Sequence, residues 1–443
     1  MASSTALGDL GDLGDLGDLV ALRRDACPSA HAPFEAADGA LLRVRVPGGI
    51  IGSGGLRAIA AVANRSDNGI IELTNRANIQ LRGFTATAAT SALAVLIDAD
   101  LVNPDRGADA RRNVVGSPLA GIDTGELVDV RPTVAAVADV LTGWTGAISP
   151  KFGVIVDGGG VSHLRERRHD VVLGAVVVDG RVVFEVGFGE ALPVGQQVDP
   201  CTPTLVVEVG DAARVVAVAL GLGLWLSERP ADVVKRLGRD GALTALSDAV
   251  SGRIVNGSRL ERPALPSAAP IGVGNGWVGG APVLGRMDES ALVALADFAD
   301  RFGHGQVRIT PWRSVVVPVR SDADVRALRV GLETIGMYTD VLAPAASVIA
   351  CAGSTGCTSG AADTQADARA LIARLPRGDR SAATPIHLSG CPKRCASRST
   401  AMLTLVAMAG RYDVFDAAGP VAADLEPADA FSLALTRASG WKV

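Results

Sequence analysis

The sequence predicts an α+β protein of several domains, arranged as two related halves. The chain has 443 residues, and a single hydrophobic core stops growing at about 250–300 residues. A segment of the first half recurs in the second half after a shift of 236 residues. Helical and strand-like hydrophobic patterns follow one another in both copies. Together, these observations favour a duplicated architecture with mixed helices and sheets.

The repeated segment predicts a strand, a helix and a second strand. Leu56–Gly83 aligns with Leu292–Pro318 without a gap. Each copy begins with apolar residues at helical spacing, reaches a glycine and continues into a strand-like run. A strand-like run also precedes each helix, at Leu41–Val46 and, more weakly, around Pro282–Leu284. We therefore expect two equivalent small α/β units.

A larger α/β unit is predicted to follow each small one. Ser149–Phe152 and Cys391–Arg394 are the anchor of this second similarity, because each is interpreted as a Pro-Lys turn after a strand. The two halves cover about residues 30–260 and 270–443. Duplicated halves are expected to pack about a pseudo-twofold axis with a ligand site between them.

These patterns divide the chain into five segments. Residues 7–19 repeat Gly-Asp-Leu with period three, which fits neither a helix nor a strand. The predicted segments are a disordered tail (1–26), a first small unit (27–105), a first lobe (106–265), a second small unit (266–345) and a second lobe (346–443).

Charge and hydropathy exclude several classes of partner. The net charge is -5 and there is no basic tail, so no nucleic-acid partner is expected. The most apolar helical stretch, Val215–Leu226, is shorter than the roughly 20 residues that span a bilayer. No basic stretch precedes an apolar run at the N-terminus. We expect a cytoplasmic protein without a membrane partner.

Four of the six cysteines form two pairs near the C-terminus. Cys351 and Cys357 have the spacing C-x5-C, and Cys391 and Cys395 have the spacing C-x3-C. Four thiolates are the number that a [4Fe–4S] cluster needs. Zinc also takes four thiolates, but usually from tighter pairs, and four buried unligated cysteines are a third interpretation. The other two cysteines, Cys27 and Cys201, have no partner motif and are interpreted as ordinary thiols.

The surroundings of the cysteine pairs favour a cluster. Gly353, Gly356 and Gly360 let the backbone approach a ligand closely. A helix is predicted over residues 361–375, stopped by Pro376. Its N-terminus would direct backbone N–H groups at an anionic cluster.

C-x5-C followed by C-x3-C resembles the cluster motif of the sirohaem-dependent nitrite and sulfite reductases and their relatives. The similarity extends over nearly the whole chain from about residue 30. It implies the duplicated nitrite/sulfite reductase fold, with two ferredoxin-like half-domains and two larger α/β lobes. It also implies that Cys351, Cys357, Cys391 and Cys395 hold one [4Fe–4S] cluster.

Polar motifs of that superfamily also recur in this chain. Residues 42–49 resemble its L-R-x-R-x-P-G-G strand, and residues 73–80 resemble its L-T-N-R-x-x-x-Q strand. Arg112-Asn113 resembles the start of its R-N-x-x-x-x-P motif, and Lys151-Phe152 resembles its catalytic lysine loop. The resemblance implies catalytic roles for Lys151 and Arg112.

The polar residues of these motifs suit a polyanionic macrocycle. A uroporphyrinoid carries many carboxylates, and arginine binds a carboxylate through two parallel N–H bonds. If 73–82 forms one continuous strand, Arg76, Asn78, Gln80 and Arg82 share one face. An ordinary solvated sheet face is the alternative interpretation. The expected macrocycle-binding residues are Arg45, Asn75, Arg76, Asn78, Gln80, Arg82, Arg313 and Lys393.

Two departures separate the chain from the assimilatory reductases. Gly153 stands where they carry a second lysine, in K-F-K, and Thr310–Arg313 reads T-P-W-R where they tend to carry amides. The second motif resembles the precorrin-3B synthase branch of the superfamily. That resemblance implies a monooxygenase that hydroxylates precorrin-3A at C20 with O2 and closes a γ-lactone, in aerobic cobalamin biosynthesis.

The same resemblance sets the expected cofactors and partners. The macrocycle is the substrate, so sirohaem is not expected as a cofactor. The branch is also linked to a mononuclear non-haem iron. His163 and His169 are interpreted as parts of a solvated turn, and His387 as a strand residue, so no iron ligand is assigned. No nucleotide-binding fingerprint is visible, which predicts a separate reductase or ferredoxin as electron donor.

Two other functions stay open from the sequence. One is a sirohaem-dependent nitrite or sulfite reductase, against which Gly153 argues. The other is a non-catalytic iron–sulfur electron carrier, which would not need a large polar pocket. The sequence does not indicate what Arg394, a charge beside the cluster motif, does.

Overall fold

The computed structural model describes residues 28–146, 148–195, 202–221, 247–250, 252–376, 384–397 and 402–438. The predicted tail, Cys27 and Cys201 lie outside these residues, as does the end of the apolar stretch Val215–Leu226. None of the helices in the described ranges is long and apolar enough to cross a membrane.

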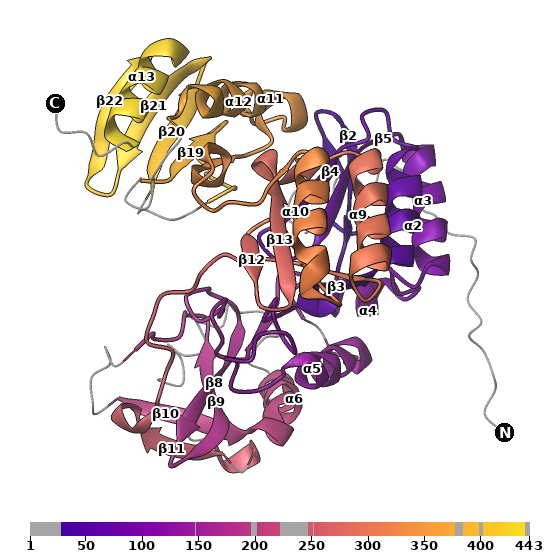
Figure 1. Cartoon of the computed structure of the whole chain (residues 1–443), viewed down its shortest axis with the longest axis vertical. Helices are drawn as coiled ribbons and strands as arrows, with labels where there is room; N and C mark the ends of the chain where they lie inside the picture. The colour runs from indigo at the N-terminus through magenta and orange to yellow at the C-terminus, as the bar shows by residue number, and fades with distance from the viewer. Residues whose placement is uncertain are drawn as a thin grey trace.

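Two sheets, one for each small unit, form the centre of the molecule (Figure 1). The first sheet has the order β1 (Phe34–Ala36), β2 (Gly39–Val44), β5 (Ile79–Phe84), β4 (Ile71–Leu73) and β14 (Arg286–Met287). The second sheet has the order β12 (Gly272–Gly274), β13 (Trp277–Pro282), β16 (Val315–Pro318), β15 (Gln306–Ile309) and β3 (Ile50–Gly52), with β17 (Met337–Tyr338) paired to β13.

The two sheets exchange equivalent short strands. β3 of the first half pairs antiparallel with β15, where Ile51 faces Val307. β14 of the second half pairs antiparallel with β4, where Arg286 faces Glu72. The shift of 236 residues that relates the two sequence copies also places β3 on β14. The predicted duplication is therefore confirmed, and each half completes the sheet of the other.

Four helices cover these sheets and share one hydrophobic core. They are α2 (Ser53–Ala63), α3 (Ala86–Asp98), α9 (Glu289–Phe302) and α10 (Val325–Thr334). α2 packs against α9, its counterpart in the second half. Leu56 and Leu292, equivalent in the two copies, are both fully buried in this core.

The N-terminal lobe contains a six-stranded sheet. Its order is β11 (Arg253–Asn256), β10 (Pro203–Glu208), β9 (Arg181–Phe188), β8 (Val171–Val178), β7 (Val154–Asp157) and β6 (Val114–Gly116). β6, β7 and β8 are parallel, and β8 to β11 are antiparallel. Two helices, α5 (Arg131–Gly143) and α6 (Ala212–Gly221), pack against each other over the core of this lobe.

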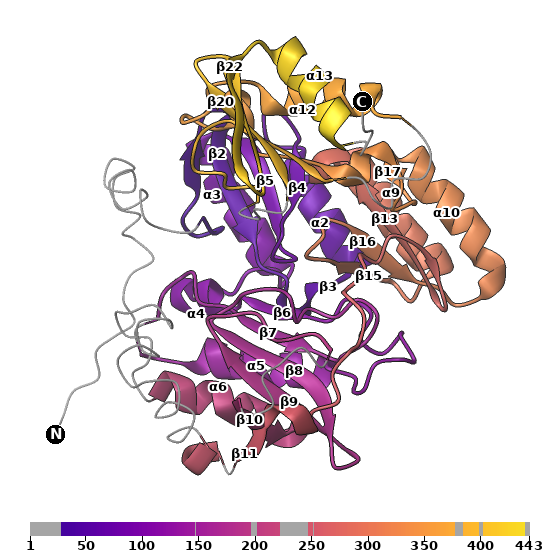
Figure 2. The ribbon, with the colours of Figure 1, turned by 90° about the vertical axis from the view of Figure 1, so that its left-hand side faces the viewer.

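The C-terminal lobe has the same arrangement of strands. Its order is β18 (Val348–Ala350), β19 (Ile386–Ser389), β20 (Leu403–Met408), β21 (Arg411–Asp416) and β22 (Gly419–Leu425). β18 to β20 are parallel and β20 to β22 antiparallel. Its helices are α12 (Thr364–Arg374) and α13 (Pro427–Ala438), and α12 ends just before Pro376, as predicted. Figure 2 shows the N-terminal lobe below the central unit and the C-terminal lobe over its upper part.

The remaining short elements lie in the connections. They are the helices α4 (Arg106–Arg111) and α11 (Gly353–Gly356) and the 3-10 turns η1 (Pro47–Gly49), η2 (Val209–Asp211), η3 (Gly257–Arg259), η4 (Val283–Gly285), η5 (Asp322–Asp324) and η6 (Pro344–Ser347). The weak strand expected around Pro282–Leu284 exists as β13 but lies earlier in the sequence, because β13 ends at Pro282 and Leu284 takes a φ of 58° within η4.

The predicted equivalence of the two Pro-Lys turns is also wrong. β7 and β19 are counterparts, since each is the middle strand of the parallel part of its lobe. Pro150-Lys151 precedes β7, whereas Pro392-Lys393 follows β19. The two turns therefore lie at opposite ends of equivalent strands. Their similar sequences do not reflect equivalent positions in the two lobes.

Candidate functional site

Two equivalent hairpin loops project from the central sheets. They are Thr74–Asn78, between β4 and β5, and Thr310–Ser314, between β15 and β16. The amide of the first residue donates to the carbonyl of the last in both loops, at 2.9 Å. Ala77 and Arg313 have matching φ values of 54° and 57°. The local fold of the two loops is thus the same, although their sequences differ.

The first hairpin loop overturns one expectation. Residues 73–82 do not form a continuous strand, because β4 ends at Leu73 and β5 begins at Ile79. The predicted row of four polar side chains on one strand face is therefore wrong. Only Gln80 and Arg82 lie on β5, while Arg76 and Asn78 belong to the loop.

Hydrogen bonds tie this loop to the segment that carries Lys151. Asn78 Nδ2 donates to Asn113 Oδ1 at 3.4 Å, and Asn113 Nδ2 donates to the carbonyl of Phe152 at 3.1 Å. Arg76 Nη1 donates to the carbonyl of Lys151 at 3.3 Å. Lys151 itself is exposed. The structure brings Arg76, Asn78 and the lysine segment together, and it leaves the ammonium group of Lys151 accessible.

Asp109 holds two of the predicted site residues. Arg45 Nη1 lies 3.3 Å from one carboxylate oxygen of Asp109, and Arg112 Nη2 lies 3.0 Å from the other. Arg112 also donates to the carbonyl of Leu101 at 2.7 Å. Asp109 is fully buried and Arg45 is 3% exposed. Both guanidinium groups therefore contribute to packing of this region in the structure described.

Arg82 links the first sheet to the cysteine-bearing lobe. Its guanidinium pairs with Asp38 at 2.8 Å and with Glu72 at 3.3 Å. It also donates to the carbonyl of Gly356, the residue before Cys357. The two carboxylates keep the pKa of Arg82 above its usual value although burial acts to lower it. Arg82 therefore connects the first sheet to the segment that carries Cys357.

The four paired cysteines gather at the carboxyl ends of β18 and β19. We call residues 351–357 and 391–395 the cysteine loops. The amide of Gly390 donates to Cys351 Sγ at 3.0 Å, and Thr364 Oγ1 lies 3.6 Å from the same sulfur. Burial, and then the charges of the other three cysteines, raise the pKa of Cys395. The four thiols are therefore close enough to interact electrostatically.

Three glycines allow the cysteine loops to pack backbone against backbone. A Cβ atom on Gly360 would lie 2.5 Å from the carbonyl carbon of Gly353. A Cβ atom on Gly390 would lie 3.3 Å from the Cα atoms of both Gly353 and Gly360. Any side chain at Gly360 would collide with the backbone of Gly353 and Ser354, so this position requires glycine.

The donor set fits a cluster better than a single ion. Within the described ranges, no group of three or more His, Cys, Asp or Glu side chains is placed so that it could hold one metal ion. A cubane takes one thiolate at each of four separate iron atoms and is stabilised by N–H groups directed at its sulfurs. Four interacting thiols with a hydrogen bond to Cys351 suit that requirement. The described residues do not fit a mononuclear iron, and we assign none.

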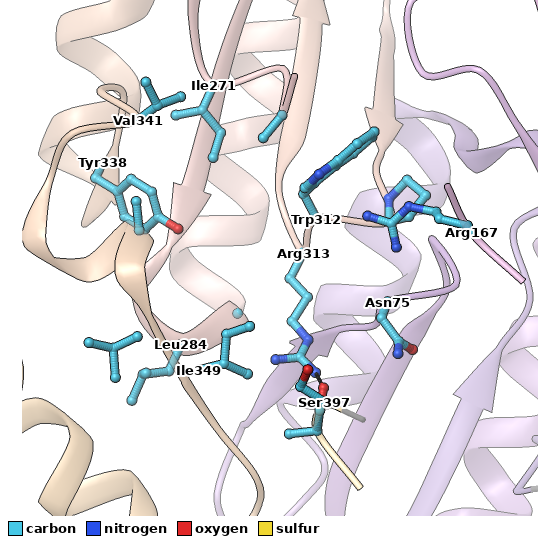
Figure 3. A pocket seen from close by; sticks show the side chains of 16 residues that line it. Asn75, Arg167, Ile271, Leu284, Trp312, Arg313, Tyr338, Val341, Ile349 and Ser397 are labelled. Atoms are coloured by element: carbon cyan, nitrogen blue, oxygen red, sulfur yellow. Dashed lines mark hydrogen bonds between the residues drawn. The ribbon is translucent and has the colours of Figure 1, made fainter. Parts of the chain in front are cut away.

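A cavity of about 380 Å³ opens between the hairpin loops and both lobes (Figure 3). The cavity is lined by Asn75, Arg167, Ala269, Ile271, Leu284, Gly285, Pro311, Trp312, Arg313, Tyr338, Val341, Ala346, Val348, Ile349, Ala396 and Ser397. Its walls thus combine aromatic and aliphatic side chains with a few polar groups, as ligand sites usually do. The last two residues directly follow Cys395, so the cavity adjoins the cysteine loops.

The polar groups of this cavity include predicted and unpredicted residues. Asn75 and Arg313 were expected, and Arg313 Nη2 donates to the carbonyl of Ala396 at 2.9 Å. Arg167 and Tyr338 were not. Arg167 lies over the ring of Trp312, with 4.5 Å between the guanidinium carbon and the ring centroid. Burial lowers the pKa of Arg167 to about 10 and raises that of Tyr338 to about 12.

The segment before Arg167 corrects another expectation. His163 is 2% exposed and Arg165 is fully buried, so this is no solvated turn. His163 Nε2 is 2.9 Å from the carbonyl of Leu265. Burial first, and then Arg76, lower the pKa of His169 to about 3. The run of charges in this segment gave no indication that Arg167 lines a cavity.

The remaining site prediction, Lys393, lies on the surface of the second cysteine loop. Its Nζ donates to Ser359 Oγ at 3.3 Å. Gln80, on β5, is half-buried between Arg43 and Glu72 of the neighbouring strands. Gln80 therefore belongs to the first sheet and Lys393 to the cysteine-bearing lobe.

Comparisons with known proteins identify the two small units. The model of the nitrite/sulfite reductase ferredoxin-like half domain matches the chain twice, at residues 34–99 and 272–334. The two small units of the chain are therefore nitrite/sulfite reductase ferredoxin-like half domains. In fold the chain is similar to the NirA protein of Mycobacterium tuberculosis, with a TM-score of 0.68 and 21% identity over 85% of this chain and 74% of that one.

Relatives that match most of the chain have different activities. A precorrin-3B synthase of Sinorhizobium sp is 28% identical over 413 residues, covering 89% of this chain and 83% of the relative. A ferredoxin–nitrite reductase of Leptolyngbya laminosa is also 28% identical, over 84% of this chain and 77% of the relative. These relatives are oxidoreductases, and identity alone does not choose between their reactions.

Proposed function

We propose that this protein is a precorrin-3B synthase, an O2-dependent monooxygenase that hydroxylates precorrin-3A at C20 and forms a γ-lactone. The similarity to the Sinorhizobium enzyme supports the proposal. A nitrite reductase is equally similar in sequence. An observation at the site is therefore needed to choose between the synthase and the reductase reaction.

That observation is the packing at Gly153. A Cβ atom at this position would lie 2.6 Å from Asn113 Nδ2 and 3.0 Å from His169 Cδ2. The amide of Gly153 is also fixed, because it donates to Asp170 Oδ2 at 2.9 Å. A second lysine, which the resemblance associates with binding a small oxyanion, would displace the side chains of Asn113 and His169 here. The site supports a reaction on the macrocycle better than reduction of sulfite or nitrite.

The macrocycle would be held by the first sheet, the hairpin loops and the cysteine loops. Arg76, Asn75 and Arg313 are the predicted residues whose placement beside the cavity or the lysine segment suits carboxylate binding. Lys151 is our candidate for proton transfer, since its ammonium group is accessible and its backbone is fixed by Arg76. Arg112 would act by holding Asp109 and the segment that leads to Asn113.

Cys351, Cys357, Cys391 and Cys395 would hold a [4Fe–4S] cluster, which supplies single electrons when bound. A monooxygenase reaction also needs electrons from outside the chain. Ferredoxin-dependent relatives support a ferredoxin or a separate reductase as the donor. Arg82 would position the first cysteine loop through the carbonyl of Gly356.

The test is a spectrum and a turnover assay on protein purified without oxygen. We expect iron–sulfur absorption without sirohaem bands, a spectral change on adding precorrin-3A, and conversion to precorrin-3B that takes one oxygen atom from labelled O2. Lys151→Ala should slow this turnover while the iron–sulfur spectrum stays unchanged, because the side chain lies outside the thiol set.

Sirohaem bands in the isolated protein, together with reduction of nitrite or sulfite, would contradict the proposal. They would instead place this chain with the reductases. An iron–sulfur spectrum that precorrin-3A does not change, with no turnover, would favour the simple electron carrier.

A further inference from the structure

His387 is a buried side chain that the fold leaves without hydrogen bonds. It lies on β19, and its exposed fraction is 0%. Neither Nδ1 nor Nε2 has a partner. Because a buried polar group without a partner is costly, native structures rarely keep one without a reason such as an absent ligand.

Strand register shows which side of the lobe His387 faces. Its neighbours are Ile349 on β18 and Thr404 on β20. Laterally paired residues of adjacent strands project from the same face of a sheet. The side chain of Ile349 lines the cavity beside Arg313 (Figure 3). His387 therefore lies on the cavity side of the sheet, whereas the next residue, Leu388, belongs to the hydrophobic core on the other side.

Two arginines lie close enough to His387 for their charges to act on it. Burial first, and then the charges of Arg313 and Arg394, lower the pKa of His387 to about 4, so the imidazole is neutral at pH 7. Arg394 lies over the ring of Phe415 at 4.4 Å, and Phe415 is the register partner of Thr404 on the same face. In the part of the chain that the structure describes, neither arginine forms an ion pair with a carboxylate.

We infer that Arg313, His387 and Arg394 form a carboxylate-binding subsite beside the cysteine loops. The subsite has two guanidinium groups and a ring N–H donor, and no carboxylate of the described residues forms an ion pair with either arginine. A carboxylate accepts from both kinds of donor. It takes one side-chain carboxylate of the macrocycle, so this inference rests on the proposed function. It also gives Arg394 a role beyond a charge beside the motif.

Binding at this subsite is coupled to proton uptake. A carboxylate between the arginines offsets their repulsion of a proton on His387 and accepts a hydrogen bond from the imidazolium. The charged groups that depress proton binding in the empty subsite are Arg313 and Arg394. Ligand binding at pH 7 should therefore draw a proton from the buffer, by linkage.

The probe is uroporphyrin III, a stable macrocycle with a carboxylate on every side chain. It is titrated into cluster-loaded protein purified without oxygen, by calorimetry at pH 7 in two buffers of different ionisation enthalpy. We expect wild-type protein to take up more protons on binding the macrocycle than His387→Leu does. His387→Leu should bind about 10- to 100-fold more weakly, because a hydrogen bond to a charged group is lost.

Two further variants separate this subsite from a general loss of structure. His387→Asn keeps a neutral N–H donor, so its affinity should stay closer to wild type although proton uptake falls as in His387→Leu. His304→Leu removes an exposed histidine and should change neither quantity. The iron–sulfur spectrum and melting temperature of each variant report folding.

Unchanged affinity and proton uptake in His387→Leu would overturn the inference, as would weaker binding with proton uptake retained. These results leave the proposed function standing, since the macrocycle still binds. Wild-type protein that binds no uroporphyrin III while it turns over no precorrin-3A would instead remove the proposed function.

Discussion

Glu185 is a buried carboxylate held between two buried arginines in the N-terminal lobe. Arg262 Nη2 lies 2.9 Å from Glu185 Oε1, and Arg165 Nη2 pairs with Glu185 Oε2. Arg165 is fully buried and Glu185 is 2% exposed. Arg165 also donates to the carbonyl of Pro193 at 2.8 Å. This triad fixes the segment that leads to Arg167, and so it acts on one wall of the cavity.

Glu185→Gln should destabilise the protein by about 3–5 kcal/mol, because it leaves two buried guanidinium groups without a counterion. Urea unfolding followed by circular dichroism measures the change. Asp179→Asn is the matched control, since it breaks the exposed pair with Arg259 and should cost at most about 1 kcal/mol. Equal effects of the two variants would contradict this view of the triad.

The roles of single residues were predicted best where the residues that act together are close in sequence. The cysteine pairs were identified from spacing, and the structure gathers their four thiols at one end of the lobe. The role of Asp109 could not be predicted, because Arg45 lies 64 residues away from it along the chain. Ion pairs between residues far apart in sequence determine whether an arginine side chain is bound within the protein or can bind a ligand.

At the scale of elements, the N-terminal lobe has loops equivalent to the cysteine loops. They follow β6 and β7 and carry carboxyl groups in place of thiols. Glu126 is the central member: burial first, and then Asp157, Asp123 and Asp129, raise its pKa to about 8. Asp157 is fully buried and accepts from Ser117 Oγ at 3.1 Å.

Glu126 should make stability depend on pH. Its ordinary pKa of 4.5 applies to the unfolded chain, whereas the folded value is about 8. Between these values the folded state binds more protons, so the free energy of unfolding falls as pH rises from about 4.5 to about 8. Glu126→Gln is neutral throughout and should be more stable than wild type above pH 8 but not below pH 4.5.

Melting temperatures across this pH range measure the effect. Glu208→Gln is the control, because Glu208 is exposed and its replacement should leave the shape of the curve unchanged. A curve for Glu126→Gln parallel to that of wild type would show that Glu126 is already ionised at neutral pH.

Elements were harder to predict where a turn has a strand-like sequence. The run 73–82 alternates apolar and polar residues, but Thr74 and Asn78 close a hairpin loop within it. The loop is stabilised by the Thr74 hydroxyl, which accepts from the amide of Asn78 at 3.0 Å. Periodicity alone does not distinguish such a loop from a strand.

At the scale of the whole molecule, the exchange of β3 and β14 makes the two halves depend on each other. Ile51→Pro removes a donor and distorts β3, so we expect β15, in the other half, to lose protection. Hydrogen exchange at the amides of Gln306–Ile309 measures this. Phe34→Pro, in the outer strand β1, is the control and should leave β15 protected.

Protection of β15 that survives Ile51→Pro would show that the second sheet is stable without the exchanged strand. The duplication behind this exchange was visible in the sequence as a shift of 236 residues. The exchange itself was not, because β3 pairs with a strand more than 250 residues away, and local patterns carry no information on such pairing.

The exchanged strands also indicate how the duplicated chain arose. A single ancestral copy would have had an exposed edge beside the counterpart of β15 and a short strand without a place of its own. In a dimer of such copies, the short strand of each copy pairs with the exposed edge of the other. The present protein therefore corresponds to a symmetric homodimer whose gene was duplicated and fused. Such a dimer had two identical sites. After fusion the sites were free to diverge, and Cys351 and its partners remain at one while carboxyl groups occupy the other.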